Sequence, residues 1–262
     1  MKKLIVAVLI VVAEAAIAAE PQEVVFTLGG AQLRGFIYKP PGDGPFPAVL
    51  YNHGSERRPG EKPALGALFA SHGYVFFVPH RRGHGRSPVD ALIDSLYSQG
   101  ARSVVALQEA HLADQMAALA YLKGVGYVDP ARIAVAGCSY GGIQTVLAVE
   151  ANARRNLQLR AAIDFAGGAI TWQKSAELRQ RMLQAIREAS IPVFFVQAED
   201  DYDVTPSRTL AAELSRLGKP HRIAIFPPYG TTPAEGHGAF CFRGGDVWGS
   251  EVLAFLKAAM EK

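Results

Sequence analysis

Residues 137–141 read Gly-Cys-Ser-Tyr-Gly, a G-x-S-x-G motif with Ser139 at its centre. The apolar run 133–136 before it predicts a buried strand, and the pattern of 141–152 predicts a helix. A serine at such a strand-to-helix turn stands above the sheet at a helix N-terminus, where developing negative charge is favoured. Glycines two residues before and after it let the crossing chain segments pass. We therefore predict that Ser139 is a nucleophile.

Cys138 is the other side chain of this motif that could attack a carbonyl carbon. A motif centred on Cys138 would have Ala136 and Tyr140 at its two flanking positions. Tyr140 is too large for a position that must be small, so we expect Cys138 to be an apolar filler of the core.

His237 is the histidine best placed to act as the base. In folds with this turn the chain order is serine, acid, histidine, which leaves only His221 and His237 as candidates. His221 begins the predicted strand 222–226 and so lies at the wrong end of the sheet. His237 follows that strand in a Gly-rich loop, and we predict that it takes the proton of the serine.

A carboxylate is needed to orient that histidine, and it is expected after the predicted strand 193–196. Four carboxylates lie there: Glu199, Asp200, Asp201 and Asp203. Asp201 has the best spacing and is the predicted acid, with Asp200 as the alternative. Asp203 is expected to cap a turn or a helix.

The oxyanion of an acyl-transfer reaction is usually held by two backbone N–H groups. The residue after the nucleophile supplies one, which here is Tyr140. The loop after the predicted strand 48–51 supplies the other, and we predict Ser55, with Glu56 as the alternative. His53 in the same loop is expected to orient it rather than to do chemistry.

Alternating strands and helices must position these residues. The predicted strands are an antiparallel hairpin (24–28 and 32–38) and six short apolar runs (48–51, 74–78, 133–136, 161–165, 193–196 and 222–226). The predicted helices are 64–71, 104–123, 141–152, 172–189, 207–217 and 247–260. Short apolar runs fit strands that are buried on both faces of a parallel sheet. We therefore predict an α/β protein: a mostly parallel twisted sheet with helices on both faces and an N-terminal antiparallel hairpin.

The N-terminus has the pattern of a secretory signal. Lys2 and Lys3 precede the apolar run 4–13, and Ala16 and Ala18 then supply small residues at the two positions that a signal peptidase reads. We expect 1–18 to be a signal peptide and 19–262 to be a single catalytic domain, exported to the periplasm or the medium and not attached to a membrane.

Charge and composition exclude other classes of function. The 27 basic and 24 acidic residues give a net charge of +3 without a long basic run, so a nucleic-acid partner is not expected. The His, Cys, Asp and Glu residues lack metal-site spacing, so we expect neither a metal nor a cofactor. The oligomeric state is left open.

Together these motifs resemble the α/β-hydrolase superfamily, and within it the dienelactone hydrolase and prolyl-oligopeptidase-like serine hydrolases. The resemblance covers about residues 26–256. The motifs that carry it are His53-Gly54, Arg82-Gly83-x-Gly85-x-Ser87, residues 137–142, Asp201 before Pro206, and Gly236-His237-Gly238. It implies an α/β-hydrolase fold with a Ser139, Asp201 and His237 triad. Dienelactone hydrolases carry cysteine where this chain has Ser139, so lactone specificity is not expected. The chain also has no propeller domain, which argues against a dedicated oligopeptidase.

We expect hydrolysis of a small carboxylic ester through an acyl-enzyme. The segment 166–192 leaves no room for a large cap, and 89–102 is a modest insertion that could line the pocket. A small peptidase or amidase is the alternative, and a non-catalytic binding protein would require a damaged triad.

Cys138 and Cys241 are the two cysteines of the chain, and both lie near the predicted site. In an oxidising compartment they could pair. The unpredictable geometry of the loop after His237 and the expected burial of Cys138 leave the pairing open.

Overall fold

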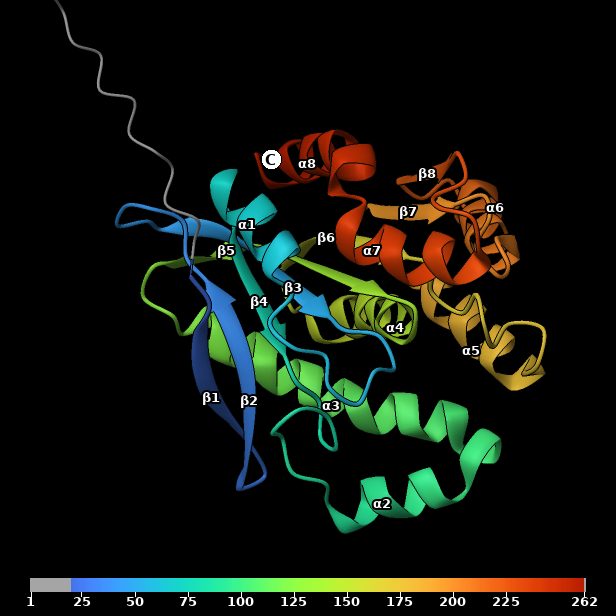
Figure 1. Ribbon diagram of the computed structural model, residues 1–262, viewed down its shortest axis with the longest axis horizontal. Helices are drawn as coiled ribbons and strands as arrows, with labels where there is room; N and C mark the ends of the chain where they lie inside the picture. The colour runs from blue at the N-terminus through green and yellow to red at the C-terminus, as the bar shows by residue number, and fades with distance from the viewer. Residues whose placement is uncertain (1–19, 262) are drawn as a thin grey trace, which may run out of the picture.

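An eight-stranded sheet runs through the protein (Figure 1), as seen in a computed structural model that describes residues 20–261. The expected signal peptide at 1–18 lies outside the described residues. The strands are β1 (Gln22–Leu28), β2 (Ala31–Tyr38), β3 (Phe46–Asn52), β4 (Val75–Pro79), β5 (Val128–Cys138), β6 (Leu159–Phe165), β7 (Val193–Ala198) and β8 (His221–Phe226). Their order is β1-β2-β4-β3-β5-β6-β7-β8. The β1–β2 and β2–β4 pairs are antiparallel and all the others are parallel, which confirms the predicted sheet and its N-terminal hairpin.

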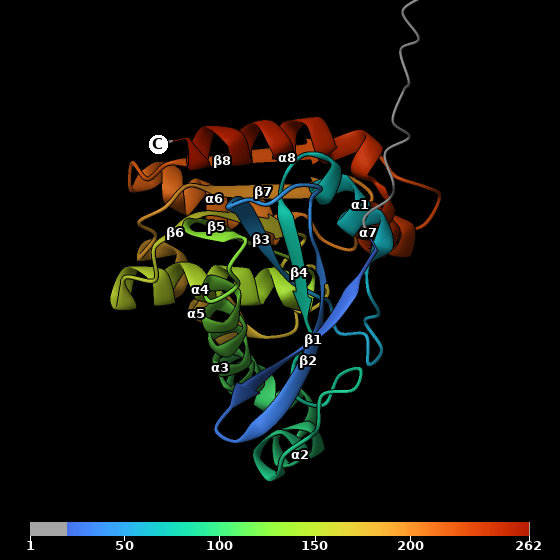
Figure 2. The same ribbon diagram turned by 90° about the vertical axis from the view of Figure 1, so that its left-hand side faces the viewer.

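Helices cover both faces of the sheet (Figure 2). The main helices are α1 (Pro63–Ser71), α2 (Ala91–Ser98), α3 (Val104–Lys123), α4 (Tyr140–Arg155), α5 (Ala176–Arg187), α6 (Thr205–Arg216), α7 (Phe240–Arg243) and α8 (Gly245–Met260), with short turns η1 (Gly100–Ser103) and η2 (Glu235–Ala239). Helices α3 to α6 pack on one face, whereas α1, α7 and α8 pack on the other. Within the described range, none of these helices is long and apolar enough to cross a lipid bilayer.

The central strands are apolar throughout because both of their faces are buried. Side chains alternate between the two faces of a strand. Leu50 and Phe77 accordingly join the core beneath α3 and α4, whereas Val49 and Phe76 join the core beneath α1 and α8. This two-sided burial explains why short apolar runs located the strands.

Two helical segments were not predicted. The insertion after β4 contains α2, whose first turn is capped by the Asp90 carboxylate accepting from the Ile93 N–H group at 2.9 Å. The predicted Gly-rich loop around His237 is instead a turn of π-helix, η2, that continues into α7. Burial of Phe240 and Cys241 holds this segment in place and outweighs the weak helix propensity of its glycines.

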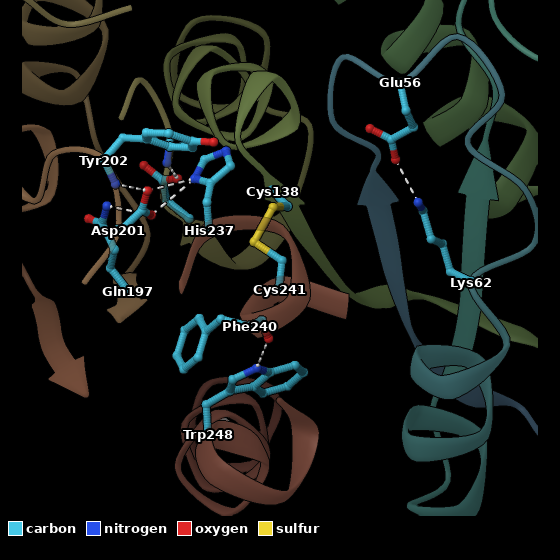
Figure 3. The surroundings of a disulfide bond; sticks show 12 residues. Glu56, Lys62, Cys138, Gln197, Asp201, Tyr202, His237, Phe240, Cys241 and Trp248 are labelled. Carbon is cyan, nitrogen blue, oxygen red and sulfur yellow. Dashed lines mark hydrogen bonds and ion pairs between the residues drawn. A yellow bond between two sulfur atoms is a disulfide. The ribbon is translucent and has the colours of Figure 1, made fainter. Parts of the chain in front are cut away.

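A disulfide joins Cys138, the last residue of β5, to Cys241 in α7 (Figure 3). The two Cα atoms are 6.1 Å apart, and each residue is only 1% exposed. The pairing that the sequence left open is therefore present in the fold, and the small apolar role expected of Cys138 is only part of its role.

Candidate active site

Ser139 occupies the turn between β5 and α4. Its φ of 58° and ψ of −116° lie outside the regions that non-glycine residues usually adopt, at a cost of about 1–3 kcal/mol. Its N–H group donates to the carbonyl oxygen of Phe165 at the end of β6, over 2.8 Å. A Cβ atom on Gly137 would collide with the carbonyl of Gly141, and one on Gly141 would collide with the backbone of Asn52. The packing around this turn therefore requires the two small residues of the motif.

His237 and Asp201 form a buried pair at the same edge of the sheet. The Nδ1 atom of His237 lies 2.9 and 3.0 Å from the two carboxylate oxygens of Asp201. The side chain of His237 is 9% exposed and that of Asp201 is 0% exposed. With Nδ1 carrying the proton and donating it to this carboxylate, Nε2 is the nitrogen that can accept a proton.

Two polar residues that the sequence did not single out hold the Asp201 carboxylate in place. The Gln197 side-chain amide donates to Asp201 Oδ2 at 2.8 Å and accepts from the Ser207 hydroxyl at 2.7 Å. The Tyr202 N–H group donates to Asp201 Oδ1 at 2.6 Å. A signal for Gln197 was present, because a buried amide in the otherwise apolar strand β7 needs partners.

The neighbouring carboxylates point elsewhere. Asp200 accepts from the Tyr229 N–H group at 2.9 Å, and Asp203 accepts from the Thr205 N–H group at 2.8 Å. The structure thus places Asp201, and not Asp200, against the imidazole of His237.

The disulfide joins the histidine segment to the serine turn. His237 and Cys241 are four residues apart in continuous helical backbone, and the sulfur of Cys241 is bonded to that of Cys138, the residue before Ser139. Figure 3 shows His237 between the Asp201 carboxylate and the disulfide. Its Nε2 atom is buried and has no hydrogen-bond partner among the described residues, so the serine–histidine hydrogen bond is not closed in this structure. Such bonds are often long without substrate.

The predicted oxyanion residues flank the turn. Tyr140 is the first residue of α4, and Ser55 lies exposed in the loop after β3. Gly54 in that loop passes so close to the turn that a Cβ atom on it would lie 3.6 Å from the carbonyl oxygen of Cys138. The loop of Ser55 and the N-terminus of α4 therefore lie next to each other.

Arg81 contacts both the loop before Ser55 and the ring of Tyr140, a role that the sequence did not reveal. Its guanidinium donates to the carbonyl oxygens of His53 at 2.8 Å and Gly54 at 2.6 Å. It also lies 4.7 Å from the centre of the Tyr140 ring, within the range of a cation–π contact. At 3% exposure, this arginine is a buried support for the loop that precedes Ser55.

A cluster of neutral histidines surrounds Arg81. Burial, followed by the charge of Arg81, lowers the pKa of His84 to about 3 and that of His111 to about 2. The same causes hold the pKa of His53 well below its usual value. His111 Nδ1 lies 2.8 Å from the Tyr140 hydroxyl. Among these groups the positive charge at neutral pH is therefore carried by the guanidinium.

These rings pack against one another in tilted and edge-to-face arrangements. The ring centres of His53 and His84 are 4.9 Å apart, and those of His84 and His111 are 5.6 Å apart. Within residues 20–261 no group of three or more His, Cys, Asp or Glu side chains is arranged to hold a metal ion.

Comparisons with known proteins agree with this architecture. The model of the dienelactone hydrolase family matches residues 33–234. The acylaminoacyl peptidase of Pyrococcus horikoshii is similar over 94% of this chain, with a TM-score of 0.72 and 20% identity, and this chain spans 42% of that peptidase. A search of curated proteins found no match.

Two other solved structures have the same fold. Esterase Est22 is similar over 94% of this chain and 80% of its own, with a TM-score of 0.70 and 15% identity. Dipeptidyl peptidase 4 of Porphyromonas gingivalis is similar over 93% of this chain and 36% of its own, with a TM-score of 0.69 and 18% identity. At such low identities these similarities show a shared fold.

Proposed function

Because the chain belongs to the dienelactone hydrolase family, and is thus a hydrolase, we propose that it cleaves carboxylic esters by a serine mechanism. Ser139 is the nucleophile, His237 the general base and Asp201 the acid that orients it. The observation that carries this proposal is the buried pair of His237 and Asp201, at 2.9 Å, at the sheet edge where the Ser139 turn lies.

The proposed reaction proceeds through an acyl-enzyme. His237 Nε2 takes the proton of the Ser139 hydroxyl as its oxygen attacks the ester carbonyl carbon, and Asp201 stabilises the imidazolium through Nδ1. The N–H groups of Tyr140 and Ser55 stabilise the oxyanion. The tetrahedral intermediate collapses, and the alcohol leaves with the proton from His237. A water molecule activated by His237 then releases the carboxylic acid.

The nucleophile distinguishes this chain within its family. Dienelactone hydrolases carry cysteine at the position of Ser139, and a serine hydroxyl depends more on its base than a thiol does. Hydrogen bonds from Gln197 and from the Tyr202 N–H group hold the Asp201 carboxylate, which in turn orients His237 as the base. We therefore propose simple carboxylic esters rather than dienelactones as substrates.

A small peptidase or amidase is the second candidate. It is supported by the fold shared with two peptidases, of which this chain spans 42% and 36%. A shared fold is weak support for a substrate class, so we place this candidate after the esterase. The intact pairing of His237 and Asp201 argues against a non-catalytic binding protein.

We also propose that residues 19–262 are one exported catalytic domain. The signal-like pattern of residues 1–18 supports export. The disulfide between Cys138 and Cys241 supports it independently, because such bonds persist mainly in oxidising compartments.

Substrate profiling tests the proposed reaction. We would measure hydrolysis of p-nitrophenyl esters of increasing acyl length, alongside aminoacyl p-nitroanilides. The wild type would be compared with Ser139→Ala and with a control, Ser71→Ala, which removes an exposed hydroxyl on α1. We expect the wild type and Ser71→Ala to hydrolyse esters at equal rates and Ser139→Ala to be nearly inactive. Parental activity in Ser139→Ala would refute the mechanism, and faster cleavage of anilides than of esters would favour the amidase.

A further inference from the structure

The disulfide joins two of the segments that carry the proposed triad. Cys138 directly precedes Ser139 at the end of β5, and Cys241 follows His237 by four residues. Side chains four residues apart on a helix lie on the same face. The face of the η2–α7 segment that presents His237 is therefore the face that the disulfide holds against the serine turn.

Apart from apolar packing, few interactions tie the histidine segment to this part of the fold. His237 is bonded to Asp201 after β7, and the carbonyl of Phe240 accepts from the Trp248 ring N–H at 2.9 Å (Figure 3). Neither of these bonds joins the segment to the serine turn itself. Among the described residues, no hydrogen bond or ion pair joins residues 227–244 to β5 or to α4. The sulfur–sulfur bond is thus the covalent link between the nucleophile turn and the segment of the base, beside their shared apolar packing.

The histidine segment also has features that make such a link useful. A π-helical turn is a rare local geometry that often occurs at functional sites, and here it contains Gly236 and Gly238. Glycines lower the intrinsic stability of helical backbone. The position of His237 is therefore set by its anchors more than by its local sequence.

We propose that Cys138 and Cys241 are a positioning pair, whose disulfide holds His237 within reach of Ser139, so that full activity requires the oxidised protein. This inference rests on the proposed serine mechanism. It predicts that the enzyme gains its full activity only after the disulfide forms, which under the proposed export would be outside the reducing cytoplasm.

Loss of the bond is a defined chemical step. A dithiol reductant supplies two electrons and two protons, the sulfur–sulfur bond breaks, and Cys138 and Cys241 become thiols. The reductant itself closes to a cyclic disulfide. Re-oxidation by dissolved oxygen returns the electrons and protons to oxygen, giving hydrogen peroxide, and re-forms the bond.

The expected effect is on turnover rather than on substrate binding. The disulfide is buried, with each cysteine only 1% exposed, so its loss removes no side chain that can contact the substrate directly. A displacement of a catalytic group by about 1 Å can cost roughly a hundredfold in rate. We expect kcat to fall by about 10- to 100-fold while KM changes by less than about threefold.

The test compares three forms of the full chain: oxidised wild type, wild type refolded in dithiothreitol and then desalted, and Cys138→Ala/Cys241→Ala. Thiol titration after denaturation would verify each redox state, and kcat and KM would be measured at 25 °C with a p-nitrophenyl ester. The control is Leu122→Ala, which removes a buried side chain at the C-terminal end of α3, away from the site. Its destabilisation should lower the unfolding midpoint and leave kcat unchanged.

We expect the reduced protein and the double variant to lose turnover, and re-oxidation to restore it in the wild type only. A kcat within about twofold of the oxidised value would overturn the proposal, as would an equal loss in Leu122→Ala. Failure of the serine mechanism is distinguished by Ser139→Ala: if that variant matches the oxidised wild type, the mechanism is wrong and the positioning role falls with it.

Discussion

Replacing Arg81 with methionine tests how the predicted oxyanion loop is held. The guanidinium donates to the carbonyl oxygens of His53 and Gly54, one residue before Ser55. It also covers the ring of Tyr140 at 4.7 Å. Methionine keeps much of the apolar volume of the arginine but removes all of its donors and its charge.

The size of the effect follows from these contacts. A buried acceptor left without a donor costs about 1–3 kcal/mol, so two carbonyls would cost at most about 6 kcal/mol, and less if the Gly54 carbonyl accepts instead from His53 Nδ1, which lies 2.9 Å away. Part of this loss is offset because the buried guanidinium is itself costly, as the lowering of its pKa by burial indicates. We expect a net loss of roughly 1–4 kcal/mol in the free energy of unfolding. If the loop shifts enough for the Ser55 N–H group to miss the oxyanion, kcat falls by about 10²–10³.

Urea unfolding and steady-state kinetics with a p-nitrophenyl ester measure the two effects separately. A boronic acid that forms a tetrahedral adduct should also bind Arg81→Met more weakly, because the oxyanion is held less well. Arg181→Met is the matched control, since Arg181 pairs with Glu109 and Glu150 on the helical face away from the site. A destabilised Arg81→Met with parental kcat would refute the reasoning, because Arg81 would then support the fold without positioning the loop.

Three further predictions concern other buried groups. Asp201→Asn should lower kcat by about 10⁴ with little change in KM, because an amide favours the wrong tautomer of His237; steady-state kinetics showing less than a tenfold loss would contradict this. Burial raises the pKa of Asp164 from 3.8 to about 7. The folded protein thus keeps a proton that the unfolded chain releases, and stability should fall by at most about 4 kcal/mol as the pH rises from about 4 to about 7. Asp164→Asn should remove this fall in urea unfolding across that range, and an unchanged slope would contradict the assignment. Replacing both Cys138 and Cys241 with alanine should cost about 4–5 kcal/mol in urea unfolding, because the bond closes a sequence separation of 103 residues; a loss below about 1 kcal/mol would contradict the estimate.

The fold was largely readable from the sequence because the central strands are buried on both faces. Runs such as 193–196 and 133–136 are apolar throughout, and they located β7 and β5 although β5 begins five residues earlier. The secondary structure of the segment around His237 could not be predicted in this way. Its glycines predicted a loop, whereas burial of Phe240 and Cys241 against distant elements makes it helical.

In the candidate site, too, the residues with local sequence signals could be predicted, whereas those that depend on distant contacts could not. Ser139, Asp201 and His237 could be predicted from the sequence because their chain order and their spacing from strands are local properties. Gln197 and Arg81 could not, because their roles come from contacts with residues that other elements bring to them. Arg81, for example, meets the loop of His53 across 28 positions of the chain. The disulfide is an intermediate case, since the sequence showed both cysteines near the site but not the geometry between them.

The nucleophile can be identified most directly by trapping it. A p-nitrophenyl alkylphosphonate, which mimics the tetrahedral intermediate, would be reacted with the full chain and the adduct located by intact mass and peptide mapping. We predict one adduct per chain, on Ser139, that is absent in Ser139→Ala and forms slowly in His237→Gln. An adduct on another residue, or unchanged labelling of Ser139→Ala, would contradict the proposed mechanism.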